Sequence, residues 1–101
     1  MRIIVFFDLP VETSRDRKEY RVFRKFLIEE GFVMMQKSVY CKLALNRSIM
    51  NGQIKRLRTH RPKAGIVEIL TVTEKQFTQI EYLIGEKQTT TIDNEDRLII
   101  L

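Results

Sequence analysis

A run of β-branched and aromatic residues near the N-terminus, residues 3–7 (IIVFF), constrains the fold more than any other feature of the sequence. A continuous apolar run of this length predicts a strand that is buried on both faces, and therefore a central strand of a sheet. Pro10 ends the strand, because proline has no amide hydrogen to donate to a strand ladder. The chain therefore begins with the middle of a sheet, and later segments must supply the flanking strands.

Helical and strand patterns alternate along the rest of the chain. Thr13 or Ser14 can cap a helix that runs to about Glu30 and ends at Gly31. Further strands are predicted at about 32–37, 39–45, 66–73 and 97–101, a second helix at about 47–60, and a single capped turn at 73–77. Residues 79–84 fit either a strand or a helix. The join at 36–38 has no Asn-Gly turn, so it is either a tight hairpin or a bend in one ribbon.

The predicted order is β-α-β-β-α-β with one or two added C-terminal strands, which matches the α+β ferredoxin-like arrangement. A chain of 101 residues and 12.1 kDa has the size of one small domain, so we expect a single domain over residues 1–101. Both helices would cover one sheet face and leave apolar side chains of the other face in water. Such a face predicts a two-fold homodimer, and the terminal strand at about 97–101 can pack on the partner protomer.

Charge is distributed unevenly along the chain. The net charge is +5, yet residues 13–63 carry fourteen basic and four acidic side chains, whereas residues 64–101 carry three and seven. This asymmetry favours a polyanion-binding face, with nucleic acid the commonest partner, over a merely solvated basic surface. The longest apolar run is too short to span a bilayer, and the single cysteine, Cys41, excludes an internal disulfide. We therefore expect a cytoplasmic protein with a reduced thiol and no membrane partner.

The first helix concentrates its cations on one side. At about 100° per residue, Tyr20, Phe23, Phe26 and Leu27 form an apolar stripe that faces a core. The neighbouring arc of about 120° holds five basic side chains, namely Arg17, Lys18, Arg21, Arg24 and Lys25. Like charges spaced at i,i+3 and i,i+4 repel each other, so this arc lowers the stability of the helix unless an anion binds there.

Asp8 is the best candidate for chemistry, because it follows the first strand where the chain leaves the interior. Its carboxylate can bind Mg²⁺ or Mn²⁺, or it can cap the turn at Pro10 by accepting backbone N–H groups. A metal there needs more than one carboxylate, and Glu12 is the only other acid near Asp8 in the basic half. A two-fold dimer would bring two copies of Asp8 together. The other candidates fit surface, loop or core positions better than reactive ones; they are Phe32, Ser38, Tyr40, Cys41 and His60.

Several segments together resemble the CRISPR-associated Cas-two (Cas2) family, and most of all the branch that accompanies Cas-nine effectors. The segments are 5–10 (VFFDLP), 23–27 (FRKFL), 30–32 (EGF) and 36–40 (QKSVY), together with the basic pair at 17–18. The resemblance extends over essentially the whole chain. Phe7 departs from it, because a tyrosine is common in the family at this position.

The resemblance implies a ferredoxin-like homodimer in which two copies of Asp8 face each other across the two-fold axis and bind Mg²⁺ or Mn²⁺. It implies a metal-dependent endonuclease that acts on RNA or double-stranded DNA, with Asp8 as the catalytic and metal-binding residue. It also implies a scaffold in CRISPR adaptation, whose dimer bridges dimers of the Cas-one integrase and carries duplex DNA during spacer acquisition. The candidate phosphate contacts are Arg17, Arg21, Arg24 and Lys25.

We expect the scaffold to be the physiological role and the endonuclease activity to be compatible with it. The alternative is a non-enzymatic ferredoxin-like domain that regulates or binds a small ligand.

Overall fold

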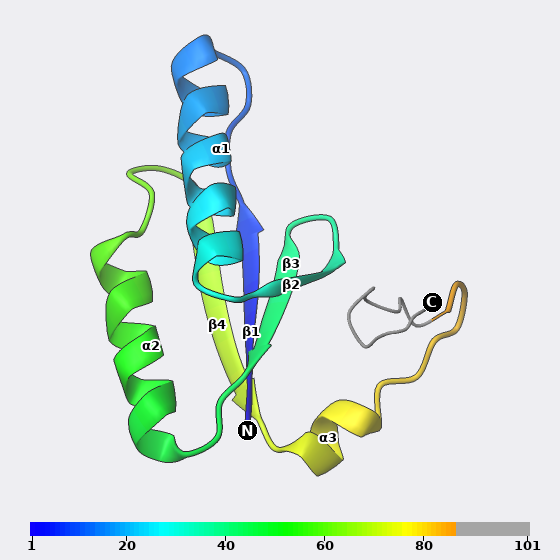
Figure 1. Ribbon diagram of the computed structural model, residues 1–101. Coiled ribbons are helices and arrows are strands. Elements are labelled where there is room, and N and C mark those ends of the chain that lie inside the picture. Colours follow the sequence, from blue (N-terminus) through cyan, green and yellow to red (C-terminus); the bar gives the residue numbers. More distant parts are fainter. Residues whose placement is uncertain (87–101) are drawn as a thin grey trace.

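The computed structural model describes residues 1–86, and its elements follow the predicted order. The elements are β1 (Arg2–Asp8), α1 (Ser14–Glu29), β2 (Val33–Gln36), β3 (Val39–Leu43), α2 (Arg47–Thr59), β4 (Ile66–Val72) and the short α3 (Glu74–Thr78). The strands form one antiparallel sheet in the order β2-β3-β1-β4, and α1 and α2 lie on the same face of it (Figure 1). The predicted α+β ferredoxin-like arrangement is confirmed, with the N-terminal strand inside the sheet.

The helix boundaries follow from capping residues in the sequence. Thr13 caps α1, because its side chain accepts from the Asp16 amide while the Asp16 carboxylate accepts from the Thr13 amide. Asn46 caps α2 by accepting from the Ile49 amide. Gly31 follows α1 with a φ of +95°, a left-handed conformation that glycine adopts without strain. None of the helices in the described part of the chain has the length and apolar character needed to cross a bilayer.

The join between β2 and β3 is a tight hairpin and not a bend in one ribbon. Lys37 and Ser38 alone connect the paired residues Gln36 and Val39. Ser38, the second of these two residues, has a φ of +64°, a left-handed conformation that is uncommon for residues other than glycine. The pairing register shifts by one residue just before Gln36, and such a bulge bends the short edge strand β2.

Residues 79–84, whose alternation fitted a strand or a helix, form neither. α3 ends at Thr78, the Gln79 amide closes its last turn on the Gln76 carbonyl, and an irregular segment follows. Leu83 and Ile84 are 88% and 95% exposed, so the apolar alternation reflects no packed face within the described chain. The predicted terminal strand at about 97–101 lies outside the described residues.

The hydrophobic core lies between the two long helices and one face of the sheet. β1 contributes Ile3, Val5 and Phe7, and α1 contributes Phe23 and Leu27, each of which is buried. The Phe7 and Phe23 rings meet edge to face with their centroids 5.3 Å apart, an arrangement that aromatic pairs prefer. The core therefore takes alternate residues of the central strand and leaves the others to the opposite face.

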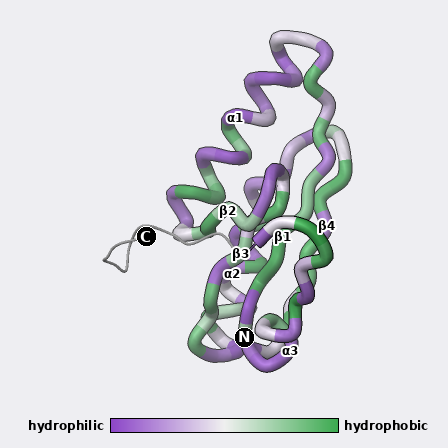
Figure 2. The backbone as a smooth tube through the Cα atoms, turned by 90° about the vertical axis from the view of Figure 1, so that its right-hand side faces the viewer, coloured by the Kyte–Doolittle hydropathy of each residue, from purple (hydrophilic) through white to green (hydrophobic). Residues whose placement is uncertain are grey.

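The opposite face of the sheet is largely uncovered in residues 1–86, as the sequence predicted. Pairing places Leu43, Ile66 and Leu70 on this face, and their side chains are 46%, 59% and 50% exposed. In the turned view of Figure 2 the strands contain long hydrophobic stretches, whereas the outer turns of α1 are largely hydrophilic. We call this surface the open face. Its exposed apolar area is of the kind that marks a contact surface.

α3 covers one end of the open face. The Arg2 guanidinium donates to both carboxylate oxygens of Glu74, at 2.8 and 3.1 Å. The same guanidinium lies over the Phe77 ring, 4.3 Å from its centroid. These contacts anchor the chain that follows β4 against the start of β1, and they leave the end of the face around Ile66 uncovered.

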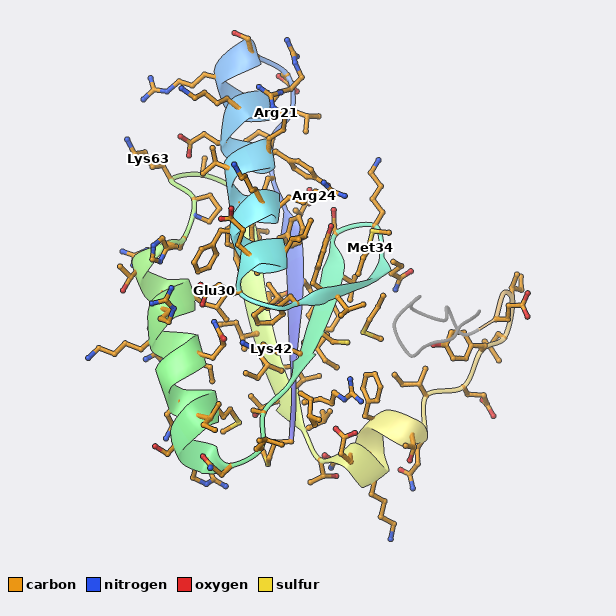
Figure 3. The ribbon with its side chains drawn as sticks, viewed as in Figure 1. Arg21, Arg24, Glu30, Met34, Lys42 and Lys63 are labelled. Carbon is orange, nitrogen blue, oxygen red and sulfur yellow. The ribbon has the colours of Figure 1, made fainter. Side chains whose placement is uncertain are left out.

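Glu30, the C-cap of α1, joins both long helices to the sheet. Its carboxylate accepts from the Arg56 guanidinium at 2.6 and 2.7 Å and from the Gln53 amide at 3.0 Å. Lys42 of β3 donates to the Glu30 backbone carbonyl and to the Gln53 side chain (Figure 3). The hydrogen bonds from Arg56, and then that from Gln53, lower the pKa of Glu30 from 4.5 to about 2.

Replacing Glu30 by Gln removes a charge on which these contacts depend. A carboxylate whose pKa falls on folding stabilises the protein above its unfolded pKa and loses this effect as the pH falls toward its folded pKa. We expect Glu30→Gln to lower the free energy of unfolding by about 1 kcal/mol at pH 7, because Arg56 is partly exposed. The difference from wild type should disappear as the pH falls from 4.5 to about 2.

Urea unfolding at pH 7 and at low pH measures this difference. Glu29→Gln is the matched control, since it changes an exposed neighbouring carboxylate and should shift stability by less than about 0.5 kcal/mol. Equal effects of the two substitutions at both pH values would contradict the role assigned to Glu30.

Candidate functional site

Asp8 lies where the sequence predicted, as the exposed last residue of the central strand. On β4 its paired residue is Ile66, and the pair one step inward on the same face is Phe6 with Glu68. Because side chains alternate along a strand, Asp8, Phe6 and Glu68 all lie on the open face, away from the helices. Asp8 and Glu68 are diagonal neighbours on adjacent strands, a relation in which residues are usually about 7–8 Å apart.

A shallow hollow of about 340 Å³ opens beside Asp8. Its lining consists of Phe6, Phe7, Asp8, Lys37, Ser38, Val39, Ile66 and Glu68. Two carboxylates and one ammonium group therefore meet at one end of a face that is otherwise mainly apolar. We call this feature the Asp8 hollow.

The hairpin turn that forms one wall of the Asp8 hollow is fixed to both β1 and α1. The Phe7 amide donates to the Ser38 carbonyl at 3.1 Å. The hydroxyl groups of Ser38 and Tyr20 are 3.3 Å apart and share a hydrogen bond. Ser38 thus has a structural role, and it holds the neighbouring Lys37 at the rim of the hollow.

Glu68 is the residue of this site that sequence reasoning missed. It lies far from Asp8 in the sequence, in the mildly acidic half, and only the pairing of β1 with β4 brings the two together. Glu12, the acid nearest to Asp8 in the basic half, does not line the hollow. One signal was present, because Glu68 is the one charged residue of a mainly apolar strand.

The Asp8 hollow offers the type of ligand that a hard divalent cation prefers, but too few of these ligands to complete its coordination. Asp8 and Glu68 offer carboxylate oxygens, which Mg²⁺ and Mn²⁺ prefer as ligands. Across residues 1–86, no three or more Asp, Glu, His or Cys side chains gather closely enough to hold a metal. Octahedral coordination would therefore need further oxygens from water, from a nucleic acid or from a second chain.

The cations of α1 are exposed, as the helical wheel predicted; they are Arg17, Lys18, Arg21, Arg24 and Lys25. We call them the α1 arc. Arg17 also donates to the carbonyls of Val11 and Glu12, both at 3.1 Å, so it braces the loop between β1 and α1. Arg24 points toward the β2–β3 hairpin in Figure 3. The arc therefore lies on the outer side of α1, away from α2.

The structure does not join Asp8 and the α1 arc in one pocket. The arc lies in the helical layer, whereas Asp8 lies on the open face of the sheet. The β2–β3 hairpin connects the two regions through the Tyr20–Ser38 contact. A long polyanion could reach both regions around the hairpin edge, but a small ligand could not.

Comparison with known proteins gives one consistent result. The profile of a family described as CRISPR associated protein Cas2 matches residues 1–80. A protein of Treponema denticola named CRISPR-associated endoribonuclease Cas2 is 50% identical over 101 residues, which are all of both chains. Relatives with the same name occur in Streptococcus mutans, 50% identical over all of this chain and 93% of the relative, and in Ligilactobacillus salivarius, 46% identical over all of both chains.

Gly65 allows the strand end that carries Asp8 to pack closely against the loop before β4. Its φ is +93°, and a Cβ there would lie 2.6 Å from the Asp8 carbonyl oxygen and 2.9 Å from Leu9 Cδ2. Gly65→Ala should therefore lower the free energy of unfolding by at least about 2 kcal/mol, because it adds backbone strain and displaces β1. Urea or thermal unfolding measures the loss.

Gly52→Ala is the matched control for this substitution. A Cβ at Gly52 would meet nothing within 4 Å, and the residue lies inside α2. Alanine should raise stability there by about 0.5–1 kcal/mol, because it favours the helix. A Gly65→Ala protein as stable as wild type would contradict the close approach at Asp8.

Proposed function

Because this chain belongs to the CRISPR-associated Cas2 family, we propose that it acts in CRISPR adaptation as a dimeric scaffold that binds duplex DNA and bridges dimers of the Cas-one integrase. The observation that carries the proposal is the exposed α1 arc on a chain whose open face is apolar. The arc supplies attraction for a polyanion, and the open face supplies a contact surface for a second copy. Family membership and the α1 arc both favour this function over a regulatory or small-ligand-binding domain.

The proposed homodimer would form through contact between the open faces of two copies. Burial of apolar surface contributes about 25 cal/mol per Å², and the side chains around Ile66 and Leu70 are about half exposed. A two-fold axis near this end of the sheet would place two Asp8 hollows next to each other. The partner copy would then supply the oxygen ligands that one chain lacks.

Binding to duplex DNA rests on the α1 arc. Arginine and lysine heads in one exposed arc contact phosphate oxygens, which fixes the position of a duplex but reads no base sequence. The arc is part of a rigid helix, capped at Thr13 and closed at its other end by the Glu30 contacts. The helix therefore fixes which side of the chain presents these side chains before DNA arrives.

A second activity, metal-dependent endonuclease cleavage of RNA or duplex DNA, is compatible with the scaffold. The relatives named above are called endoribonucleases. Asp8, together with its copy in the partner, would hold Mg²⁺ or Mn²⁺, and Glu68 would add a further carboxylate. When bound, such an ion activates water and neutralises charge on a phosphodiester. Lys37 at the rim would hold a phosphate oxygen of the substrate.

The α1 arc is tested by Arg21→Gln combined with Arg24→Gln. We expect the affinity for duplexes of unrelated sequence to fall at least about tenfold, and the slope of log affinity against log salt to fall by about 2 for each protomer whose α1 arc contacts the duplex. Gel shift or fluorescence anisotropy at several salt concentrations measures both. Lys75→Gln removes a positive charge on α3, outside the arc, and should leave the slope unchanged. Unaltered binding by the double variant would reject the arc as the DNA contact.

The metal site is tested by Asp8→Asn. This variant should lose metal-dependent cleavage and bind Mn²⁺ at least about tenfold more weakly by calorimetry, because a carboxylate ligand becomes a neutral amide. Its circular dichroism and its affinity for duplex DNA should stay unchanged, and Glu12→Gln serves as the control acid outside the hollow. Retained spacer integration by Asp8→Asn would show that the scaffold role suffices. Cleavage at the wild-type rate would assign the nuclease activity elsewhere.

A further inference from the structure

A second cavity lies beside the first turns of α1, and the proposed function does not use it. Its volume is about 130 Å³, and it opens between the end of β1, the start of α1 and the loop before β4. We call it the proline pocket, because two of its three walls carry a proline. The residues that line it are Leu9, Pro10, Arg15, Asp16, Glu19, Pro62, Lys63 and Ala64.

The proline pocket faces away from the cations of the α1 arc. At about 100° per residue, Arg15, Asp16 and Glu19 share the side of α1 that faces the core further along the helix. The centre of the α1 arc lies about 170° from the centre of this group around the helix. In Figure 3, Lys63 and Arg24 accordingly lie on opposite sides of α1. A nucleic acid held by the α1 arc would therefore leave the pocket open.

Each wall of the proline pocket is held in place by the surrounding backbone. Pro10 and Pro62 have fixed φ angles, because their rings close on the backbone nitrogen. The capping box at Thr13 fixes the first turn of α1. Gly65 packs closely on the Asp8 carbonyl, which holds the loop before β4 against the end of β1. The pocket is therefore formed before a ligand arrives, and this lowers the entropic cost of binding.

The size and lining of the pocket fit one aromatic ring. Leu9, Ala64 and the two proline rings make its wall mainly apolar. An apolar cavity of about 150 Å³ in a protein interior binds one benzene molecule. At about 130 Å³, the proline pocket offers nearly as much space. Sites for whole small-molecule ligands usually have volumes of about 300 Å³ or more. The pocket therefore suits one side chain of a larger molecule better than a free cofactor.

The charges at the rim favour a polypeptide over a nucleic acid. Arg15 and Lys63 are balanced by Asp16 and Glu19, so the rim has no net attraction for a polyanion. Within residues 1–86, neither Glu19 nor Lys63 takes part in an ion pair. A polypeptide can present a basic and an acidic residue on either side of an aromatic one. It can then pair with both of these groups while the ring enters the pocket.

We propose that the proline pocket docks one aromatic side chain of a partner polypeptide. A basic residue beside the aromatic one would face Glu19, and an acidic residue would face Lys63. Aromatic side chains that fill a small pocket with a polar rim contribute much of the binding energy at protein interfaces. The pocket shares no residue with the Asp8 hollow or the α1 arc, so the inference does not depend on the proposed function.

Titration of the full-length protein with short peptides, followed by NMR, tests the proposal. The probes are acetyl-Lys-Phe-Glu-amide and its reverse, acetyl-Glu-Phe-Lys-amide, because the pocket does not fix the direction of the partner chain. The same peptides with alanine in place of phenylalanine are the controls. At least one phenylalanine peptide should shift the amide signals of Leu9, Lys63 and Ala64 to saturation. Its affinity should be at least about tenfold higher than that of its alanine version.

Ala64→Leu fills the pocket and should weaken binding of this peptide at least about tenfold, because the ring loses its space. Ala64 is exposed, so the variant should fold, which circular dichroism and thermal unfolding check. Thr78→Leu is the matched control, since it adds the same side chain on α3, outside the pocket, and should bind as wild type does. Glu19→Lys replaces attraction by repulsion and should weaken binding at least about threefold.

The absence of saturable shifts with both phenylalanine peptides would overturn the inference, and so would equal binding by wild type and Ala64→Leu. Unchanged binding by Glu19→Lys would overturn the charge match at the rim. Adenosine is titrated separately as a probe for a nucleic-acid base. If adenosine shifts these signals and the phenylalanine peptides do not, the pocket binds a base and the polypeptide assignment fails. The variants of the α1 arc and of Asp8 test the proposed function independently of these results.

Discussion

The position of β1 in the middle of the sheet is the constraint on which the other features of this protein depend. Its side chains alternate, so Ile3, Val5 and Phe7 enter the core while Phe6 and Asp8 reach the open face. A shift of one residue in its pairing would exchange these sets, burying a carboxylate and exposing the core. The core thus holds the strand in the only register that presents Asp8 at the surface, so the interactions that stabilise the fold also position the Asp8 hollow.

The packing of the two long helices also determines where their basic side chains lie. α1 and α2 each use one side for the core and one side for their mutual contact, where Glu30 accepts from Arg56 and Phe26 stacks on His60. Only the outer sides remain for side chains that must stay hydrated. The cations of the α1 arc therefore lie on the outer side of α1, whereas Arg56, which lies in the contact between the helices, is paired with the Glu30 carboxylate. Its lowered pKa expresses the same interaction, because the surrounding donors stabilise the charged form.

Local sequence patterns predicted most of the fold. They could not predict which distant residues meet at the site, because that depends on strand pairing between distant parts of the chain. The strand at 3–7, a helix cap at Thr13 or Ser14 and the α1 arc each depend on periodicity or on contacts within one turn. The strand and the exposed arc are confirmed, and of the two candidate caps the structure shows Thr13. The sequence did not predict Glu68 as part of the site, because only the pairing of β1 with β4 brings it close to Asp8. The prediction of a strand or a helix at 79–84 was wrong, because alternating apolar residues form a strand only where a partner strand and a packed face are present. The separation of Asp8 from the α1 arc was also invisible, since a sequence does not state which face of a sheet a residue shares with a helix.

The charges of the Asp8 hollow link dimer formation to metal binding in the proposed function. Each hollow carries two carboxylates and one ammonium group, so two hollows brought together by a two-fold axis would concentrate four carboxylates against two cations. Apolar burial on the open face favours that contact, whereas repulsion between like charges opposes it. In the proposed function, a divalent cation between the copies would relieve the repulsion and would bind the assembled site more tightly than it binds one chain. Metal binding and dimerisation would then strengthen each other, because a ligand that binds one state more tightly shifts the equilibrium toward that state.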